Sequence, residues 1–111
     1  MPDAKYLIDL DGLDPVAAAP LACSGVTTYG ALRKLADVFP EEPIVVIGAG
    51  GLGLMCLSIL TALGGRGAVV VDIDERKRRA ALDCGALAAV DGRDPQALAE
   101  IVRAAGGPCA A

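Results

Sequence analysis

Unbroken runs of apolar residues alternate with stretches of helical periodicity over the second half of the chain. The runs are Ile44–Ile47, Ala68–Val71 and Leu87–Val90. An apolar run without polar alternation is typical of a strand that is buried on both faces, as in a parallel sheet. Helical patterns follow the three runs, over residues 54–63, 75–84 and 95 to about 105. This order predicts an α/β fold in which right-handed crossovers join parallel strands.

The first 43 residues carry weaker patterns. Residues 5–10 alternate weakly and predict a short strand, and Asp14 followed by Pro15 predicts the start of a short helix over 16–19. A longer helix opens at Ser24 or Thr27 and ends near Asp37. Spacing on this and two later helices predicts three core-facing sets: Tyr29, Leu32, Leu35 and Ala36; Ala80, Ala81 and Leu82; and Leu98, Ile101 and Val102.

A glycine motif follows the first apolar run directly. Gly48, Gly50 and Gly53 have the spacing G-x-G-x-x-G, which is the dinucleotide fingerprint when a strand precedes it and a helix follows it. The first glycine permits a tight turn, the second lets a pyrophosphate approach the backbone, and the third lets the helix pack closely on the strand. The N–H groups at the start of the helix then provide partial positive charge for the phosphates.

An acidic residue ends the second apolar run. Asp72 lies 24 residues after Gly48, where a carboxylate accepts hydrogen bonds from the hydroxyl groups of the adenosine ribose. The same carboxylate would repel the 2′-phosphate of NADP, so NAD is the favoured cofactor. The basic residues at positions 76–79 leave two interpretations open, since they could serve a 2′-phosphate or form the solvated face of a helix, as we expect of Arg78 and Arg79.

Composition narrows the chemistry. The 111 residues carry 14 acidic and 10 basic side chains, and the net charge of −4 argues against nucleic-acid binding. Glycine or charge breaks the longest apolar stretches well short of the roughly 20 residues that a membrane span needs. The chain has no histidine, which excludes a Ser-His-Asp triad and any histidine-ligated metal site within it.

The four cysteines are widely spaced and form no Cys-x-x-Cys pair. Since no secretory signal opens the chain either, we expect reduced thiols in a cytoplasmic protein. Cys56 and Cys84 are expected in the core, whereas Cys109 near the C-terminus is uninformative.

Four segments together resemble the zinc-type alcohol dehydrogenases of the medium-chain dehydrogenase/reductase family. They are CSGVTTYG at 23–30, IVVIGAGGLG at 44–53, VVDID at 70–74 and CGAL at 84–87. The resemblance covers about residues 6–111 and implies a Rossmann-type domain that binds NAD for hydride transfer between an alcohol and nicotinamide. It implies that cofactor contacts come from Gly51, Leu52 and Ile73 besides the fingerprint glycines and Asp72. It further implies that Lys77 reaches the same ribose as Asp72, and that Thr27 lies beside the nicotinamide.

The resemblance also implies a catalytic zinc. In the family, a cysteine just before the first helix of the cofactor domain is a zinc ligand, and Cys23 occupies that place. Thiolates are good zinc ligands, and the metal polarises the alcohol or carbonyl oxygen. Without the resemblance, a lone cysteine such as Cys23 is more often a small buried apolar residue than a metal ligand. A threonine in the position of Thr27 can equally serve as a helix cap.

The sequence also departs from the family. The N-terminal domain that supplies the other zinc ligands is missing, and only three of the expected six strands are present. We therefore expect a fragment that is inactive alone, with residues 1–22 as a linker from the catalytic domain and 23–111 as a partial NAD-binding domain. Because the strand over 44–47 then becomes an apolar edge, we also expect a homo-oligomer.

Two alternatives remain beside an NAD-dependent alcohol dehydrogenase. One is a zinc-free, NADPH-dependent quinone or enoyl reductase, against which Asp72 and Cys23 argue. The other is a non-catalytic module that binds NAD or AMP, which the lack of histidine suits but Cys23 and Thr27 do not.

Overall fold

Three parallel strands form the centre of the molecule. The computed structural model describes residues 3–107, and its sheet has the order β1-β2-β3, with β1 over Ile44–Ile47, β2 over Ala68–Val71 and β3 over Ala88–Val90. In the register, Val46 lies beside Val70, and Val70 lies beside Ala89. The three strands and their parallel order confirm the predicted Rossmann-type arrangement.

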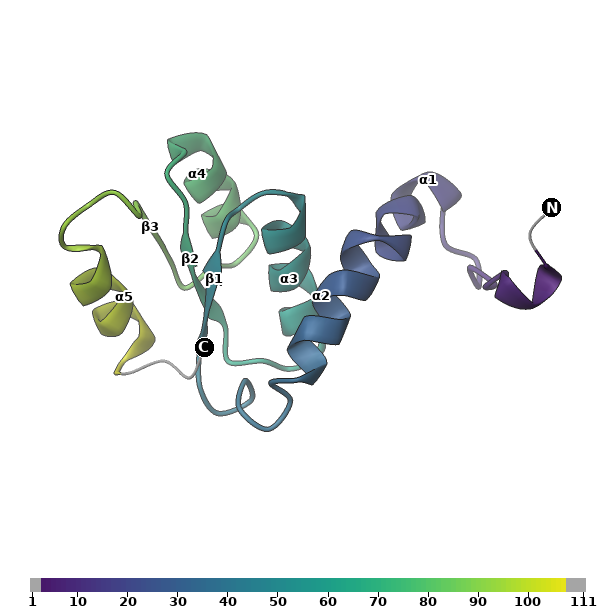
Figure 1. Ribbon diagram of the computed structural model, residues 1–111, viewed down its shortest axis with the longest axis horizontal. Coiled ribbons are helices and arrows are strands. Elements are labelled where there is room, and N and C mark those ends of the chain that lie inside the picture. The colour runs from purple at the N-terminus through teal and green to yellow at the C-terminus, as the bar shows by residue number, and fades with distance from the viewer. Residues whose placement is uncertain (1–2, 108–111) are drawn as a thin grey trace.

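Helices cover both faces of this sheet. Figure 1 shows α5 on one side of the strands and α3 on the other, with α2 packed outside α3. The helices are α1 over Pro15–Ala18, α2 over Ser24–Arg33, α3 over Gly51–Ala62, α4 over Glu75–Asp83 and α5 over Ala97–Ala105, and 3-10 turns form at Ala4–Tyr6 and Ala19–Ala22. No helix among residues 3–107 is long and apolar enough to cross a membrane.

The core divides into two layers because neighbouring residues of β2 point to opposite faces. Val70 belongs to the larger layer, which α2, α3 and α4 complete with residues such as Leu32, Leu60 and Ala81. Val69 belongs to the smaller layer under α5, together with Val90 and Ala105. This two-sided burial explains why β2 reads as an unbroken apolar run.

The prediction of a strand over residues 5–10 was wrong. A 3-10 turn occupies Ala4–Tyr6, and no regular element follows it over residues 7–10. Leu7 and Ile8 are both exposed, so the apolar alternation has no buried side to favour a strand. Figure 1 shows the reason, since the segment before α2 extends away from the sheet and has no strand beside it.

Several predicted core positions also proved wrong. Leu82 is 50% exposed and Leu98 is 73% exposed, because α4 and α5 pack on the sheet mainly through alanines. Tyr29 of α2 is also exposed, and Leu32 is the one member of its predicted set that is fully buried. Cys84 is exposed at the C-terminal end of α4, where the chain turns at Gly85 with φ of +92°. The prediction for Cys109 lies outside the described residues.

Candidate functional site

Two adjoining clefts open at the carboxyl ends of the strands, which is where ligands bind in open α/β sheets. Ile47 and Gly48, at the end of β1, line both of them. The larger cleft, of about 610 Å³, is further lined by Cys23, Ser24, Thr27, Gly50, Gly51, Leu52 and Gly53. The smaller cleft, of about 370 Å³, is further lined by Val71, Asp72, Ile73 and Gly92.

The glycine motif has the geometry that its sequence pattern predicts. Gly48 has φ of +99°, a conformation that side chains other than glycine rarely adopt. A Cβ at Gly50 would meet nothing within 4 Å, so the backbone is open to a ligand there. A Cβ at Gly53 would clash with the carbonyl oxygen of Gly48, so α3 can approach β1 only because residue 53 is glycine.

The N-terminus of α3 faces the larger cleft without a side-chain cap. Gly50 is the N-cap residue, and its backbone oxygen accepts from Leu54 N–H, while the first turn contains no acidic side chain. The backbone N–H groups of the first turn therefore keep their partial positive charge. Such an end favours an anion of the size of a phosphate group.

Asp72 joins the end of β2 to the glycine motif. Its Oδ2 accepts a hydrogen bond of 2.8 Å from Ala49 N–H, and its Oδ1 accepts one of 2.8 Å from Asp74 N–H. The Ala49 bond first, and then the Asp74 bond, hold the pKa of Asp72 below its ordinary value. A carboxylate has about four lone-pair sites, so this anion retains acceptors for a ligand in the smaller cleft.

Cys23 and Thr27 line the same cleft as the glycine motif, although 24 and 20 residues, respectively, separate them from Gly48 in the chain. Cys23 is the N-cap residue of α2 and carries an exposed free thiol. Thr27 lies inside α2, which rules out a role as its N-cap, and both side chains line the larger cleft. Over residues 3–107, no group of three or more potential ligands could hold a metal ion. Among these residues, Cys23 is therefore not part of a cluster that could hold a metal ion by itself.

The remaining predicted residues divide between the clefts and the surface. Leu52 and Ile73, both exposed, line the larger and the smaller cleft respectively. Lys77 is exposed on α4 and lines neither cleft, and its charge contributes to lowering the pKa of Asp72. The structure thus brings together the predicted residues except Lys77, whose side chain stays outside the clefts.

A group of charged residues near the smaller cleft was missed by the sequence analysis. The Arg78 side chain is only 19% exposed, so the prediction that it belongs to a solvated face was wrong. Its guanidinium group lies 3.4 Å from Asp91, and Asp91 also pairs with Arg93 at 2.9 Å. The available signal was an acidic residue directly after β3, at the same end of the sheet as Asp72.

Known proteins resemble this chain in sequence and fold. No protein-family profile matches the chain. It is 44% identical to an NAD-dependent alcohol dehydrogenase of Sulfurisphaera tokodaii over 104 residues, which are 93% of this chain and 30% of that protein. Its fold resembles a D-arabinose dehydrogenase from Sulfolobus solfataricus, with a TM-score of 0.80 and 33% identity over 93% of this chain and 32% of that one.

A further structural likeness concerns the cofactor. A quinone oxidoreductase of Escherichia coli in complex with NADPH matches with a TM-score of 0.75 and 26% identity, over 91% of this chain and 31% of that one. One of these relatives is named for NAD and the other was solved with NADPH, so the fold by itself does not determine which cofactor is bound. The chain spans about 30% of the length of the curated relatives it matches. Over 93% of its length, the chain is homologous to a segment of NAD-dependent alcohol dehydrogenases.

Proposed function

We propose that this chain binds the adenosine diphosphate half of NAD(H), as part of an alcohol dehydrogenase that transfers hydride between an alcohol or carbonyl compound and nicotinamide. The observation that carries the proposal is the Asp72 carboxylate, hydrogen bonded to the Ala49 N–H within the glycine motif. This bond joins the open backbone of the glycine motif to a carboxylate that can accept hydrogen bonds from a ribose. The 44% identity to an NAD-dependent alcohol dehydrogenase supports the same cofactor.

Each part of the two clefts then has a role in holding the dinucleotide. The pyrophosphate lies against the open backbone at Gly50, Gly51 and Leu52, where the N-terminus of α3 offsets its charge. Asp72 accepts hydrogen bonds from the ribose hydroxyls, and a bond to a charged group contributes on the order of 1.5–3 kcal/mol. Ile73 provides apolar surface beside the adenosine, and Lys77 adds positive charge near it.

The larger cleft leads toward the reacting half of the cofactor. Thr27 and Cys23 line it beyond the glycine motif, so they are the residues of this chain nearest to a nicotinamide that continues from the pyrophosphate. When bound, the nicotinamide ring accepts or releases the hydride. Cys23 would contribute one thiolate to a zinc ion whose other ligands come from outside this chain.

The charges around the smaller cleft favour NAD over NADP. A 2′-phosphate would lie against the Asp72 carboxylate, whose low pKa keeps it anionic at neutral pH. Of the basic residues on α4, Arg78 pairs with Asp91, and Arg79 lies 3.9 Å from Glu75. Arg78 is thus held in a partly buried pair, whereas the Arg79 pair is exposed and weak.

Calorimetric titration of the chain with ADP-ribose, NADH and NADPH tests this proposal. We expect ADP-ribose and NADH to bind, and NADPH to bind at least about tenfold more weakly, because like charges next to each other disfavour the wrong ligand. The variant Asp72→Asn should weaken NADH binding and reduce the difference between NADH and NADPH. Asp83→Asn is the matched control, because Asp83 is an exposed acid on α4 that lines neither cleft.

Two results would count against the proposal. A preference for NADPH would favour a reductase like the quinone oxidoreductase of similar fold. Absence of binding by a chain that shows a cooperative thermal transition would exclude a dinucleotide site of useful affinity. The transition is followed by circular dichroism on the same sample.

A further inference from the structure

Two arginines hold the backbone of the turn that follows β2. Arg78 Nη1 donates a hydrogen bond of 2.9 Å to the carbonyl oxygen of Asp72, and Arg93 Nη2 donates one of 3.1 Å to the carbonyl oxygen of Ile73. Asp72 and Ile73 are the residues of this turn that line the smaller cleft. Both main-chain carbonyls of the candidate ribose-binding segment are therefore held by charged donors.

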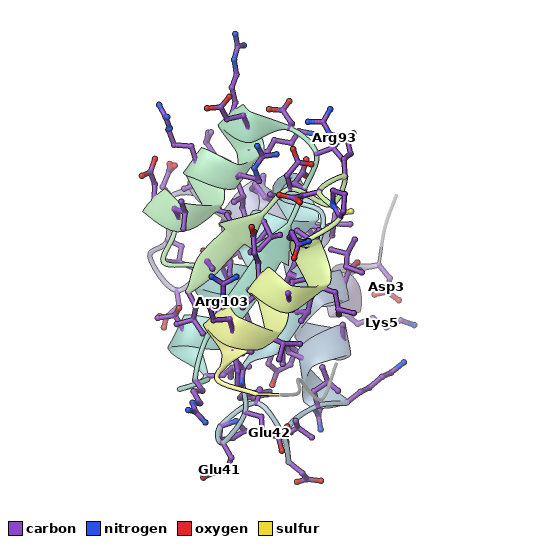
Figure 2. The ribbon with its side chains drawn as sticks, turned by 90° about the vertical axis from the view of Figure 1, so that its left-hand side faces the viewer. Asp3, Lys5, Glu41, Glu42, Arg93 and Arg103 are labelled. Atoms are coloured by element: carbon purple, nitrogen blue, oxygen red, sulfur yellow. The ribbon has the colours of Figure 1, made fainter. Side chains whose placement is uncertain are left out.

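Asp91 joins the two arginines. It directly follows β3, and its carboxylate accepts from Arg93 Nε at 3.1 Å and from Arg93 Nη2 at 2.9 Å, while Arg78 Nη1 lies 3.4 Å away. Figure 2 places Arg93 at the opposite end of the molecule from Glu41 and Glu42, which precede β1. The group thus lies at the carboxyl end of the sheet, with the clefts.

The Arg78 and Asp91 side chains are 19% and 28% exposed, so this is not an ordinary surface ion pair. The negative charge of Asp91 separates two guanidinium groups that would otherwise repel each other beside the same turn. The two nitrogens that contact Asp91, Arg78 Nη1 and Arg93 Nη2, are also the ones that donate to the two carbonyls. Each charged group therefore depends on the others for its position.

We propose that Arg78, Asp91 and Arg93 form a clamp that positions the Asp72 carboxylate for ribose recognition. The inference rests on the proposed function and names three positioning residues for the same site. Hydrogen bonds from Ala49 and Asp74 hold the two carboxylate oxygens, and the clamp holds the backbone on which they depend. Holding these groups before the ligand arrives reduces the entropy lost on binding.

The clamp also determines which charges a ligand meets. Arg78 Nη1 and Arg93 Nη2 contact Asp91 and donate to backbone carbonyls, so these two donors are engaged within the turn before a 2′-phosphate arrives. Removing the charge of Asp91 should free both cations and release the turn. The preference for NADH over NADPH should then fall together with the affinity for ADP-ribose.

A double-mutant cycle in the full chain tests the clamp. Asp91→Asn retains the shape of the side chain and removes its charge, and we expect about tenfold weaker binding of ADP-ribose, a size typical of coupled neighbours. In the Asp72→Asn background, the same substitution should cost less than about threefold, because the carboxylate that the clamp positions is already gone. Arg79→Gln is the control for lost charge on α4, since the Arg79 side chain is 77% exposed.

The outcomes are distinct. If the wild-type chain does not bind ADP-ribose, the proposed function fails. If it binds and Asp91→Asn has the same effect in both backgrounds, or none, the clamp is refuted. A general loss of stability would lower NADH and NADPH binding alike, whereas loss of the clamp lowers the preference for NADH over NADPH.

Arg93→Gln provides the same cycle should Asp91→Asn not fold, because the Arg93 side chain is 68% exposed. We expect this variant to bind ADP-ribose about threefold more weakly.

Discussion

Gly53 has a packing role that is separable from ligand binding. A methyl group at this position would meet the carbonyl oxygen of Gly48, and neither backbone can move without shifting α3 from β1. Gly53→Ala should therefore destabilise the chain by about 3 kcal/mol, the upper part of the range for overpacking. Urea denaturation followed by circular dichroism measures this change.

Gly51 provides the matched control for Gly53. It lies in the first turn of the same helix, where a Cβ would meet nothing within 4 Å. Gly51→Ala should change the free energy of unfolding by less than about 1 kcal/mol, in the stabilising direction if the helical conformation is kept. Equal stabilities of the two variants would contradict the close approach of α3 to β1.

The hydrogen bonds of Asp72 should make stability depend on pH. Ala49 and Asp74 N–H lower its pKa from an ordinary 3.8 in the folded chain, so the carboxylate contributes stability above that pH. The contribution is lost as the pH falls through the lowered pKa of the folded chain. We expect the urea midpoints of the wild type and Asp72→Asn to differ most at neutral pH and to converge toward pH 2. A constant difference across this range would contradict the prediction.

The face that α5 presents to the sheet can be tested with two neighbouring apolar residues. Ile101 packs against the layer of Val69 and Val90, whereas Leu98 is 73% exposed. Ile101→Ala should cost about 2 kcal/mol, the lower end of the range for buried residues, because Ile101 is only half-buried. Leu98→Ala should change stability by less than about 0.5 kcal/mol. If chemical denaturation shows that Leu98→Ala lowers the free energy of unfolding by more than this, Leu98 lies in the core as its spacing predicts.

Elements with self-contained patterns were predictable from the sequence, and elements defined by their neighbours were not. The β2 strand matches its predicted bounds, Ala68–Val71, because burial on both faces leaves an unbroken apolar run. The apolar face of α5 was mispredicted at Leu98, which is exposed, whereas Ile101 of the same predicted set packs on the sheet beside smaller alanines. Hydrophobic spacing identifies a helix better than it identifies which side chains a particular sheet will cover.

The candidate site shows the same division. The glycine motif and Asp72 were predictable because their spacing within one βαβ unit reflects local geometry. Arg78 was not, because a basic run on a helix has the same sequence whether it is solvated or paired. Arg93 was not either, because it lies in the turn after β3, outside any motif that its neighbours in the sequence form. The contact that distinguishes a solvated from a paired Arg78 joins α4 to Asp91 at the end of β3, and local spacing contains no information about that approach.

At the scale of the whole molecule, the open edge of β1 should govern self-association. Within residues 3–107, β1 pairs with β2 alone, and Ile47 at its end is 86% exposed. An apolar edge with unpaired backbone groups is a template for pairing with another chain. We therefore expect the apparent mass to rise with concentration in light scattering.

A charged substitution on the edge of β1 distinguishes strand pairing from nonspecific association through exposed apolar side chains. Ile47→Lys should shift the association to higher concentration, because a lysine on an edge strand opposes the approach of a second strand. Leu98→Lys removes a similarly exposed apolar side chain from α5 and should leave most of the association in place. If both variants reduce the apparent mass equally, exposed apolar area rather than the β1 edge drives association. If the wild type remains a monomer throughout the series, the edge does not pair, and the expectation of a homo-oligomer fails for this chain.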